Sequence, residues 1–225
     1  MKPTDIKRIT NTRQSPWKPD WFQQTDVFGP YQIPILKPTT LPSCPEAMAS
    51  FSRQPPPSQR QRTLLHGFVD DPKLLPLLKA PKKSLERFAT YFAVTTPDFS
   101  LCTEMPLQDR IRSTWSSRAL GAYFQQHGLQ VAPSIRWAHL SDLEYVLDGL
   151  STGGTIVLST QGLLRDQSLR KTFETGTEIV LQQLEPRHVI IYGQLPYTLH
   201  QKLSHHTEIW RFSTDISRIY QTGYN

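Results

Sequence analysis

Carboxylates and a hydroxyl follow the first two strand-like runs of the region after residue 63. Asp70 and Asp71 close the first run, and Asp98 and Ser100 close the second. If the two strands are neighbours, the carboxylates face one crevice, where they could bind Mg²⁺ or act as general acid and general base. We therefore predict Asp98, Asp70 and Ser100 as catalytic residues. The alternative is a structural role, because prolines flank Asp71 and Asp98 as they do in turns and helix caps.

An arginine and a tryptophan, Arg136 and Trp137, end the third strand-like run and are predicted to bind a ligand. The guanidinium suits a phosphate, and the indole suits a stacked base. Successive side chains of a strand point to opposite faces, so one of the two packs in the core, and Trp137 is the one expected there. His139 follows the pair and is a further candidate for a general base.

Hydroxyls and a glycine at two later strand ends complete the predicted ligand site. Ser159 and Thr160 follow the apolar run TIVL. Hydroxyls and free amides at such a point can hold an anion without a lysine, although the spacing is not that of a P-loop. Tyr192 and Gly193 end the next strand, where glycine lets a ligand or another backbone approach closely. The alternative in both places is an ordinary turn.

The motifs of several familiar enzyme classes are absent from the sequence. It has no HExxH or paired Cys/His spacing, no GxSxG elbow and no GxGxxG fingerprint. His205 and His206 are adjacent, so their side chains diverge, and they are assigned to a polar loop. His66 precedes the first strand-like run and is expected to be structural. The sequence therefore predicts no metal site and identifies no cofactor.

The six strand-like runs alternate with longer helical patterns, which predicts repeated βα units. In the clearest helix, over 106–126, apolar side chains recur every four residues and Arg118 lies off that stripe. A second helix is predicted over 166–184. A shorter one opens at Ser141, with Glu144 at the spacing of a capping box. The predicted strands are 66–71, 91–100, 129–137, 154–162, 187–193 and 208–215.

Consecutive βα units require right-handed crossovers and a sheet that helices cover on both faces. The predicted fold class is therefore α/β, with a mostly parallel sheet that is either an open doubly wound sheet or an incomplete TIM-like barrel. About 160 residues carry the repeats, which is short for an eight-unit barrel. Such sheets place their ligands at the carboxyl ends of the strands, so the candidate residues are expected to share one rim.

The first 62 residues are predicted to form a basic, proline-rich N-terminal arm and linker, followed by an α/β core domain over 63–225. Eleven of the nineteen prolines fall before Arg62, and residues 1–62 hold nine Lys/Arg against four Asp/Glu. Proline lacks the amide donor that helix interiors and central strands need. The apolar segment FGPYQIPIL is expected to dock on the core, and 43–62 is expected to be a mobile linker.

The positive charge of the arm suits contact with DNA or RNA, because neutralised phosphates release counterions. A solvated tail explains the charge equally well. No apolar run approaches the roughly 20 residues of a bilayer span, and no charged-then-apolar leader follows Met1. We therefore expect a cytoplasmic protein without membrane contact. Cys44 and Cys102 lie far apart and are expected to be reduced thiols.

Several segments together resemble one protein family. They are FGPYQIPIL, TPDFSL, GAYFQQHGLQVAPSIRW, LDGL, STQG and VIIYG. In combination they resemble the domain-of-unknown-function family 4417, whose members occur in phages, plasmids and other bacterial mobile elements. The resemblance covers about residues 28–193 and supplies a context rather than an activity. It implies that the following residues occupy motif positions: Asp98, Ser100, Arg136, Trp137, Ser159, Thr160 and Gly193.

Three functions stay open on the sequence, and whether the chain is an enzyme stays open with them. In the first, it acts on or binds a nucleotide or nucleic acid in the strand-end crevice, with Asp98 and Asp70 as acid/base or metal groups and Arg136 as phosphate anchor. In the second, it is a non-catalytic replication or accessory protein that binds nucleic acid through the basic arm. In the third, the arm grips a protein partner, for example a host defence complex.

Overall fold

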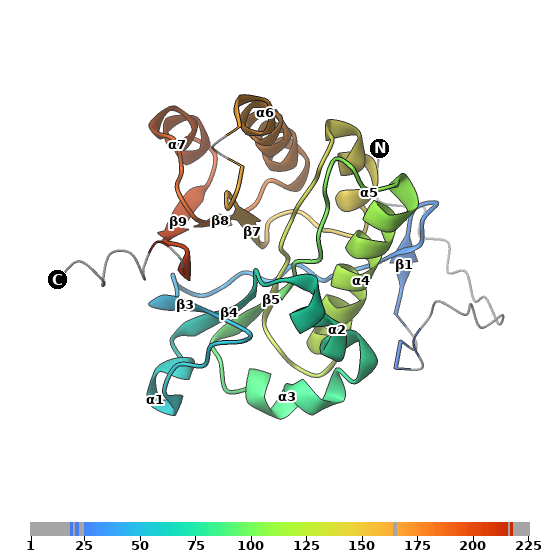
Figure 1. Ribbon diagram of the computed structural model, residues 1–225. Coiled ribbons are helices and arrows are strands. Elements are labelled where there is room, and N and C mark those ends of the chain that lie inside the picture. Colours follow the sequence, from blue (N-terminus) through green and yellow to red (C-terminus); the bar gives the residue numbers. More distant parts are fainter. Residues whose placement is uncertain (1–18, 20, 23–24, 164–165, 216, 218–225) are drawn as a thin grey trace.

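The core is a parallel sheet whose strands follow one another in the order of the chain (Figure 1). The computed structural model describes residues 19, 21–22, 25–163, 166–215 and 217. The parallel strands are Ala47–Ser50 (β3), Thr63–Gly67 (β4), Ala93–Pro97 (β5), Val131–Ala132 (β6), Thr155–Ser159 (β7), His188–Tyr192 (β8) and Glu208–Phe212 (β9). The helices are Pro57–Arg60 (α1), Asp71–Lys79 (α2), Lys82–Phe88 (α3), Leu107–Gln126 (α4), Leu143–Val146 (α5), Gln167–Leu184 (α6) and Tyr197–Ser204 (α7).

The strand order decides between the two predicted arrangements. Strands β3 to β6 pair in sequence, β7 to β9 do the same, and a parallel bridge from Ser134 to Val157 joins the two groups. A doubly wound sheet reverses its strand order at a switch point. The repeated βα units are thus confirmed, and their order matches the incomplete barrel rather than the doubly wound sheet. In the part of the chain that the structure describes, no ladder pairs β9 with β3.

Apolar side chains fill both faces of this curved sheet. One cluster takes residues from every strand between β3 and β9, among them Met48, Leu64 and Trp210, and lies inside the curve. The opposite faces of β4 to β6 pack on α2, α3 and α4, and those of β7 and β8 pack on α5, α6 and α7. Because both faces of β7 and β8 are buried, these two strands are apolar in near-continuous runs, whereas the edge strand β9 is partly exposed.

The segment 43–62 is part of the sheet, which corrects its prediction as a mobile linker. Strand β3 pairs in parallel with β4, and the amide of Glu46 donates to the carbonyl oxygen of Arg62 at 2.9 Å. Met48 is only 1% exposed. The pairing therefore crosses the boundary that was predicted after residue 62. The prolines on either side of β3 fall outside the strand itself, so they do not interrupt its ladder.

The two long helices lie where they were predicted, but the environment of one arginine differs. Helices α4 and α6 begin and end within a residue of 106–126 and 166–184. Helix α4 packs between the sheet, α5 and the N-terminal arm, so most of its circumference is buried. Arg118, which lies off the apolar stripe, is consequently 1% exposed rather than on a solvated face.

The first and third strands end earlier than the sequence indicated. The first predicted strand, 66–71, is instead 63–67, because Asp71 and the proline after it already form the first turn of α2. The third, 129–137, pairs regularly only over Val131–Ala132 and then by the Ser134 bridge. The short helix after it is held by the Asp142 carboxylate, which accepts from the amide of His139, and not by Ser141 and Glu144.

The segment FGPYQIPIL docks on the core, as expected. It forms an antiparallel hairpin of Val27–Phe28 (β1) and Ile33–Pro34 (β2). Ile33 and Leu36 are buried, and the amide of Leu36 donates to the carbonyl oxygen of Gly149 at 2.9 Å. The turn at Gly29 has a positive φ of 71°, and a Cβ there would lie 2.1 Å from the Asp148 carboxylate. The arm thus covers the loop that carries Asp148.

The burial of Asp148 under the arm makes the stability of the fold depend on pH. Burial, with Glu144 nearby, raises the pKa of the Asp148 carboxyl to about 6. A raised carboxyl pKa stabilises the fold when the group is protonated, so this contribution is present at pH 4 and is lost as the pH rises toward and past about 6. Asp148→Asn should therefore raise the midpoint of thermal unfolding by about 2 °C at pH 8 and change it little at pH 4.

Thermal unfolding of both chains at the two pH values checks this prediction. The exposed carboxylate Glu86 provides the control, and Glu86→Gln should leave the midpoint unchanged at both values. An equal effect of Asp148→Asn at both pH values would contradict it.

No helix in the described part of the chain combines the length and the apolar character that crossing a bilayer requires.

Candidate functional site

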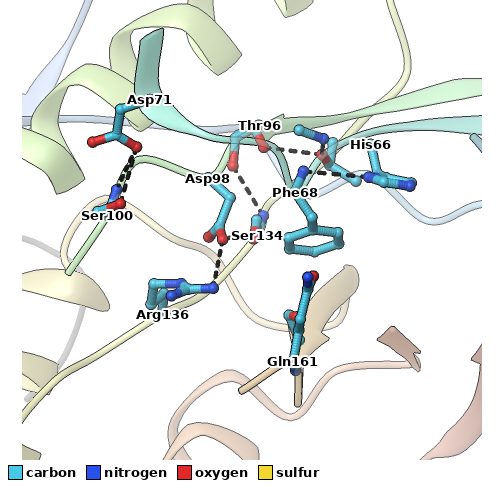
Figure 2. A network of polar contacts seen from close by, with 12 residues as sticks. His66, Phe68, Asp71, Thr96, Asp98, Ser100, Ser134, Arg136 and Gln161 are labelled. Atoms are coloured by element: carbon cyan, nitrogen blue, oxygen red, sulfur yellow. Dashed lines mark hydrogen bonds and ion pairs between the residues drawn. The ribbon is translucent and has the colours of Figure 1, made fainter. Parts of the chain in front are cut away.

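The carboxyl ends of the parallel strands place several predicted residues at one rim of the barrel. Asp98 follows β5, Arg136 lies beyond β6, and Ser159 ends β7. In Figure 2 the side chains of Asp98, Ser134 and Arg136 point toward one another, and Gln161 approaches from the β7 side. The rim predicted from the strand pattern therefore exists.

An ion pair between Asp98 and Arg136 is the centre of this group. The Arg136 Nη2 lies 2.8 Å from the Asp98 Oδ2, and the Ser134 hydroxyl donates to the Asp98 Oδ1 at 3.2 Å. The Asp98 side chain is only 6% exposed, whereas that of Arg136 is 30% exposed. Burial raises the pKa of the Asp98 carboxyl, although Arg136 and Ser134 oppose the rise. One face of the guanidinium can therefore still meet a ligand from solvent.

Backbone contacts fix the two loops that carry this pair. The amide of Ser134 donates to the Thr96 hydroxyl at 2.9 Å, which ties the β6 loop to the end of β5. The amide of Gly67 donates to the Thr95 hydroxyl at 3.0 Å. A Cβ on Gly67 would lie 2.8 Å from the Pro97 Cα and 3.1 Å from the Asp98 amide nitrogen. Asp98 therefore depends on a close backbone contact that only glycine allows.

Asp71, not Asp70, is the carboxylate that reaches the second strand end. The Asp71 Oδ1 accepts from both the amide and the hydroxyl of Ser100 at 3.0 Å, and Asp71 helps to raise the pKa of Asp98. The Asp70 side chain is 81% exposed and pairs with Lys73 on the surface. The structure thus does not bring Asp70 beside Asp98, because the chain turns into α2 between Asp70 and Asp71. Ser100 is occupied in holding that turn.

The hydroxyls after β7 and the residues after β8 lie at the same rim but differ in orientation. Ser159 is buried, and its hydroxyl accepts from the amide of Gln161 at 3.2 Å. Thr160 is also buried and lies against Gly193, where an added Cβ would be 2.3 Å from its hydroxyl oxygen. The Tyr192 ring turns into the barrel interior and its hydroxyl accepts from the amide of Asp215 at 2.8 Å. Thr160 and Tyr192 therefore pack behind the rim, and the half-buried Gly193 lies against Thr160.

Trp137 is a core residue, as the strand alternation predicted. It is 8% exposed, its ring stacks on Phe173 at 5.6 Å, and its Nε1 donates to the carbonyl oxygen of Thr172 at 3.3 Å. Helix α6 accommodates the indole at Gly176, where any Cβ would lie 2.4 Å from the ring. His139, the further candidate for a general base, is exposed and has its Nε2 3.4 Å from the carbonyl oxygen of Thr103.

A pocket of about 270 Å³ adjoins the ion pair. Gly162 contributes an exposed backbone turn to its lining. The polar side chains of the lining are Asp98, Thr103, Glu104, Arg136, Ser159, Gln161 and Thr172. Its remaining wall is largely apolar. That wall includes Leu101, Ile135, Trp137, Leu163, Leu169 and Phe173. A few polar groups at the edge of an apolar hollow are the usual composition of a small-molecule site.

Sequence reasoning missed several residues of this rim. Ser134 and Gln161 carry no signal of their own, because a serine or glutamine in a loop is usually unremarkable. His66 was placed before the first strand but lies inside β4, with no exposed surface, and contacts the rings of both Phe68 and Tyr192, which stack on each other. Its Nε2 lies 3.9 Å from the Asp215 carboxylate. The alternation of His66 with Leu65 could have identified it as facing the barrel interior.

Comparison with known proteins gives one family and two phage relatives. The family model described as Domain of unknown function (DUF4417) matches residues 25–213. The Gene 1 protein of Mycobacterium phage D29 is 31% identical over 167 residues, which are 74% of this chain and 62% of that protein. The Gene 1 protein of Mycobacterium phage L5 is 30% identical over 165 residues, 73% of this chain and 72% of that protein. The chain thus spans less than two thirds of the length of the D29 relative. No solved structure matches the chain.

Proposed function

Because the chain belongs to the DUF4417 family and is homologous to mycobacteriophage Gene 1 proteins, we propose that it serves a phage-related process by binding a nucleotide, free or within a nucleic acid, in the strand-end pocket. The observation that carries this proposal is the half-buried Arg136 at the edge of an apolar pocket. A guanidinium is the side chain best suited to a phosphate, and an apolar wall suits a base.

Several groups around Arg136 can position this ligand. Asp98 fixes one side of the guanidinium, which leaves its exposed side for a phosphate. Gln161 and the backbone at Gly162 supply amide groups at the same edge, and these can hydrogen-bond to sugar or base. The pocket is large enough for part of a nucleotide, with the remainder facing solvent through its open side.

The basic N-terminal segment supports a nucleic acid rather than a free nucleotide as the natural ligand. Residues 1–18 hold five Lys/Arg and one Asp. Such a segment adds sequence-independent affinity by neutralising phosphates, and that affinity falls steeply with added salt. The core retains its arm hairpin and β3 when only these residues are removed, whereas deletion of 1–62 would remove a strand of the sheet.

Titration of the full chain with fluorescent nucleotides and with short single-stranded DNA and RNA tests the proposal. Wild type should bind both kinds of ligand. Removal of residues 1–18 should weaken oligonucleotide binding about tenfold and reduce its salt dependence, and should leave mononucleotide binding unchanged. The matched control is Lys82→Ala with Lys83→Ala, two exposed lysines at the start of α3, beyond the end of α2 that points away from the rim.

The outcomes are distinct. Loss of oligonucleotide affinity on truncation with intact mononucleotide binding supports both parts of the proposal. A chain that binds neither ligand would refute it and would favour the protein-partner function.

A further inference from the structure

Arg118 carries a buried positive charge and does not line the proposed pocket. It lies on α4, is 1% exposed, and its Nη2 donates to the carbonyl oxygen of Val146 at 2.6 Å. Its Nε and Nη1 groups are buried and have no hydrogen-bond partner among the described residues. Buried polar groups in proteins are nearly always hydrogen-bonded, so an arginine with two unused donors requires an explanation.

Among the described residues, no counterion accompanies this charge. In the described chain, no carboxylate lies within ion-pair distance of Arg118, whereas Arg110 and Arg136 meet Asp142 and Asp98 at 3.1 and 2.8 Å. Burial lowers the pKa of Arg118 to about 9, so the group is still charged at neutral pH. An unpaired buried charge is strongly unfavourable, and proteins usually compensate it with a charge of opposite sign.

A small cavity adjoins the guanidinium. Its volume is about 20 Å³, and Val146, whose carbonyl group meets Arg118, is part of its wall. Hydroxyl residues Thr114 and Ser117 also line it and can donate to an anion, whereas the Ser134 hydroxyl in the same wall already donates to Asp98. The space admits about one water-sized sphere, which is too little for a phosphate or a carboxylate group.

We propose that this cavity binds a monoatomic anion of about the size of chloride, held by the two unused donors of Arg118. A water molecule would fit the same space and accept the same hydrogen bonds, but it would leave the charge uncompensated. Asp98 also lines the cavity but is held by Arg136 and Ser134, and it makes no ion pair with Arg118.

The site lies directly behind the strand-end pocket. Asp98, Leu101 and Arg136 line both hollows, so they form the wall between them. An anion at Arg118 would thus stabilise the inner side of this wall. The inference does not depend on what the outer pocket binds.

Thermal unfolding of the full chain at constant ionic strength tests the proposal. Sodium gluconate is replaced stepwise by sodium chloride up to about 150 mM, and the midpoint should rise by about 3 °C and then level off. Arg118→Met should abolish this response and should be at least as stable as wild type in gluconate alone. Arg170→Met, a matched change at an exposed helical arginine, should keep the response.

Crystals of the wild-type chain soaked in sodium bromide give a second measurement that does not depend on the variants. An anomalous bromide peak between the Arg118 guanidinium and the hydroxyls of the cavity supports the proposal. Identical midpoints in chloride and gluconate would overturn it, and so would a map in which the cavity holds only water.

Discussion

Replacing Arg136 with methionine is expected to weaken nucleotide binding about a hundredfold. The change keeps the aliphatic length of the side chain but removes the guanidinium that, among the described residues, lines the pocket and is open to solvent. A charge-assisted hydrogen bond to a phosphate contributes about 1.5 to 3 kcal/mol, and about 2.7 kcal/mol corresponds to a hundredfold change in Kd. Fluorescence titration of wild type and variant with the same nucleotide measures the effect.

The same substitution leaves the Asp98 carboxylate without its partner, so stability must be separated from binding. Arg136→Met alone should lower the free energy of unfolding by about 2 kcal/mol, a value reduced because the guanidinium is partly exposed. The double variant Asp98→Asn, Arg136→Met removes both charges and should regain most of that stability in urea unfolding. It should still fail to bind, and nucleotide binding by either variant at wild-type affinity would exclude Arg136 as the phosphate anchor.

Gly67→Ala is expected to destabilise the protein by about 3 kcal/mol and to weaken ligand binding as well. The added Cβ would meet the Pro97 Cα at 2.8 Å and the Asp98 amide nitrogen at 3.1 Å. Both are backbone atoms, so the clash can be removed only if β4 and β5 separate at the point where Asp98 leaves the sheet. Overpacking in a tight core typically costs about 1 to 3 kcal/mol, and a backbone clash lies at the upper end.

A second buried glycine gives the matched control. Gly154 lies directly before the amino end of β7. A Cβ there would lie 3.4 Å from the nearest backbone atoms, which is an ordinary contact. Gly154→Ala should therefore change the free energy of unfolding by less than about 1 kcal/mol and leave binding intact. Urea unfolding and nucleotide titration of the two variants check both effects. Equal stability of the two variants would show that β5 has room to move at Pro97.

The repeated βα pattern predicted where the site lies better than it predicted which residues form the site. Parallel strands that follow one another must end at one edge, so Asp98, Arg136 and Ser159 could be placed on a common rim without coordinates. Which of two adjacent residues faces that rim depends on where a strand gives way to a helix. Helix α2 begins at Asp71, and the side chain of Asp70, the residue before it, is exposed to solvent.

Two other features could not be predicted from the local sequence, because packing in the folded protein determines them. Strand β3 has the short sequence AMAS between prolines, and it becomes a strand because β4 offers an edge for pairing. Arg118 has the polarity of a surface residue, yet α4 is enclosed on several sides. Side-chain type predicts exposure only when the helix has a solvent face, and α4 has little of one.

The unbroken strand order also bears on how the chain can assemble. Every strand from β3 to β9 pairs with a strand close to it in sequence, so the ladder can grow in the direction of synthesis with short loop closures. The arm is the exception. Its Thr40 and Leu41 bond to Gly153 and Thr155 across 113 and 114 residues. These arm residues are synthesised more than a hundred residues before their partners, so they stay accessible to chaperones and proteases until those partners have folded.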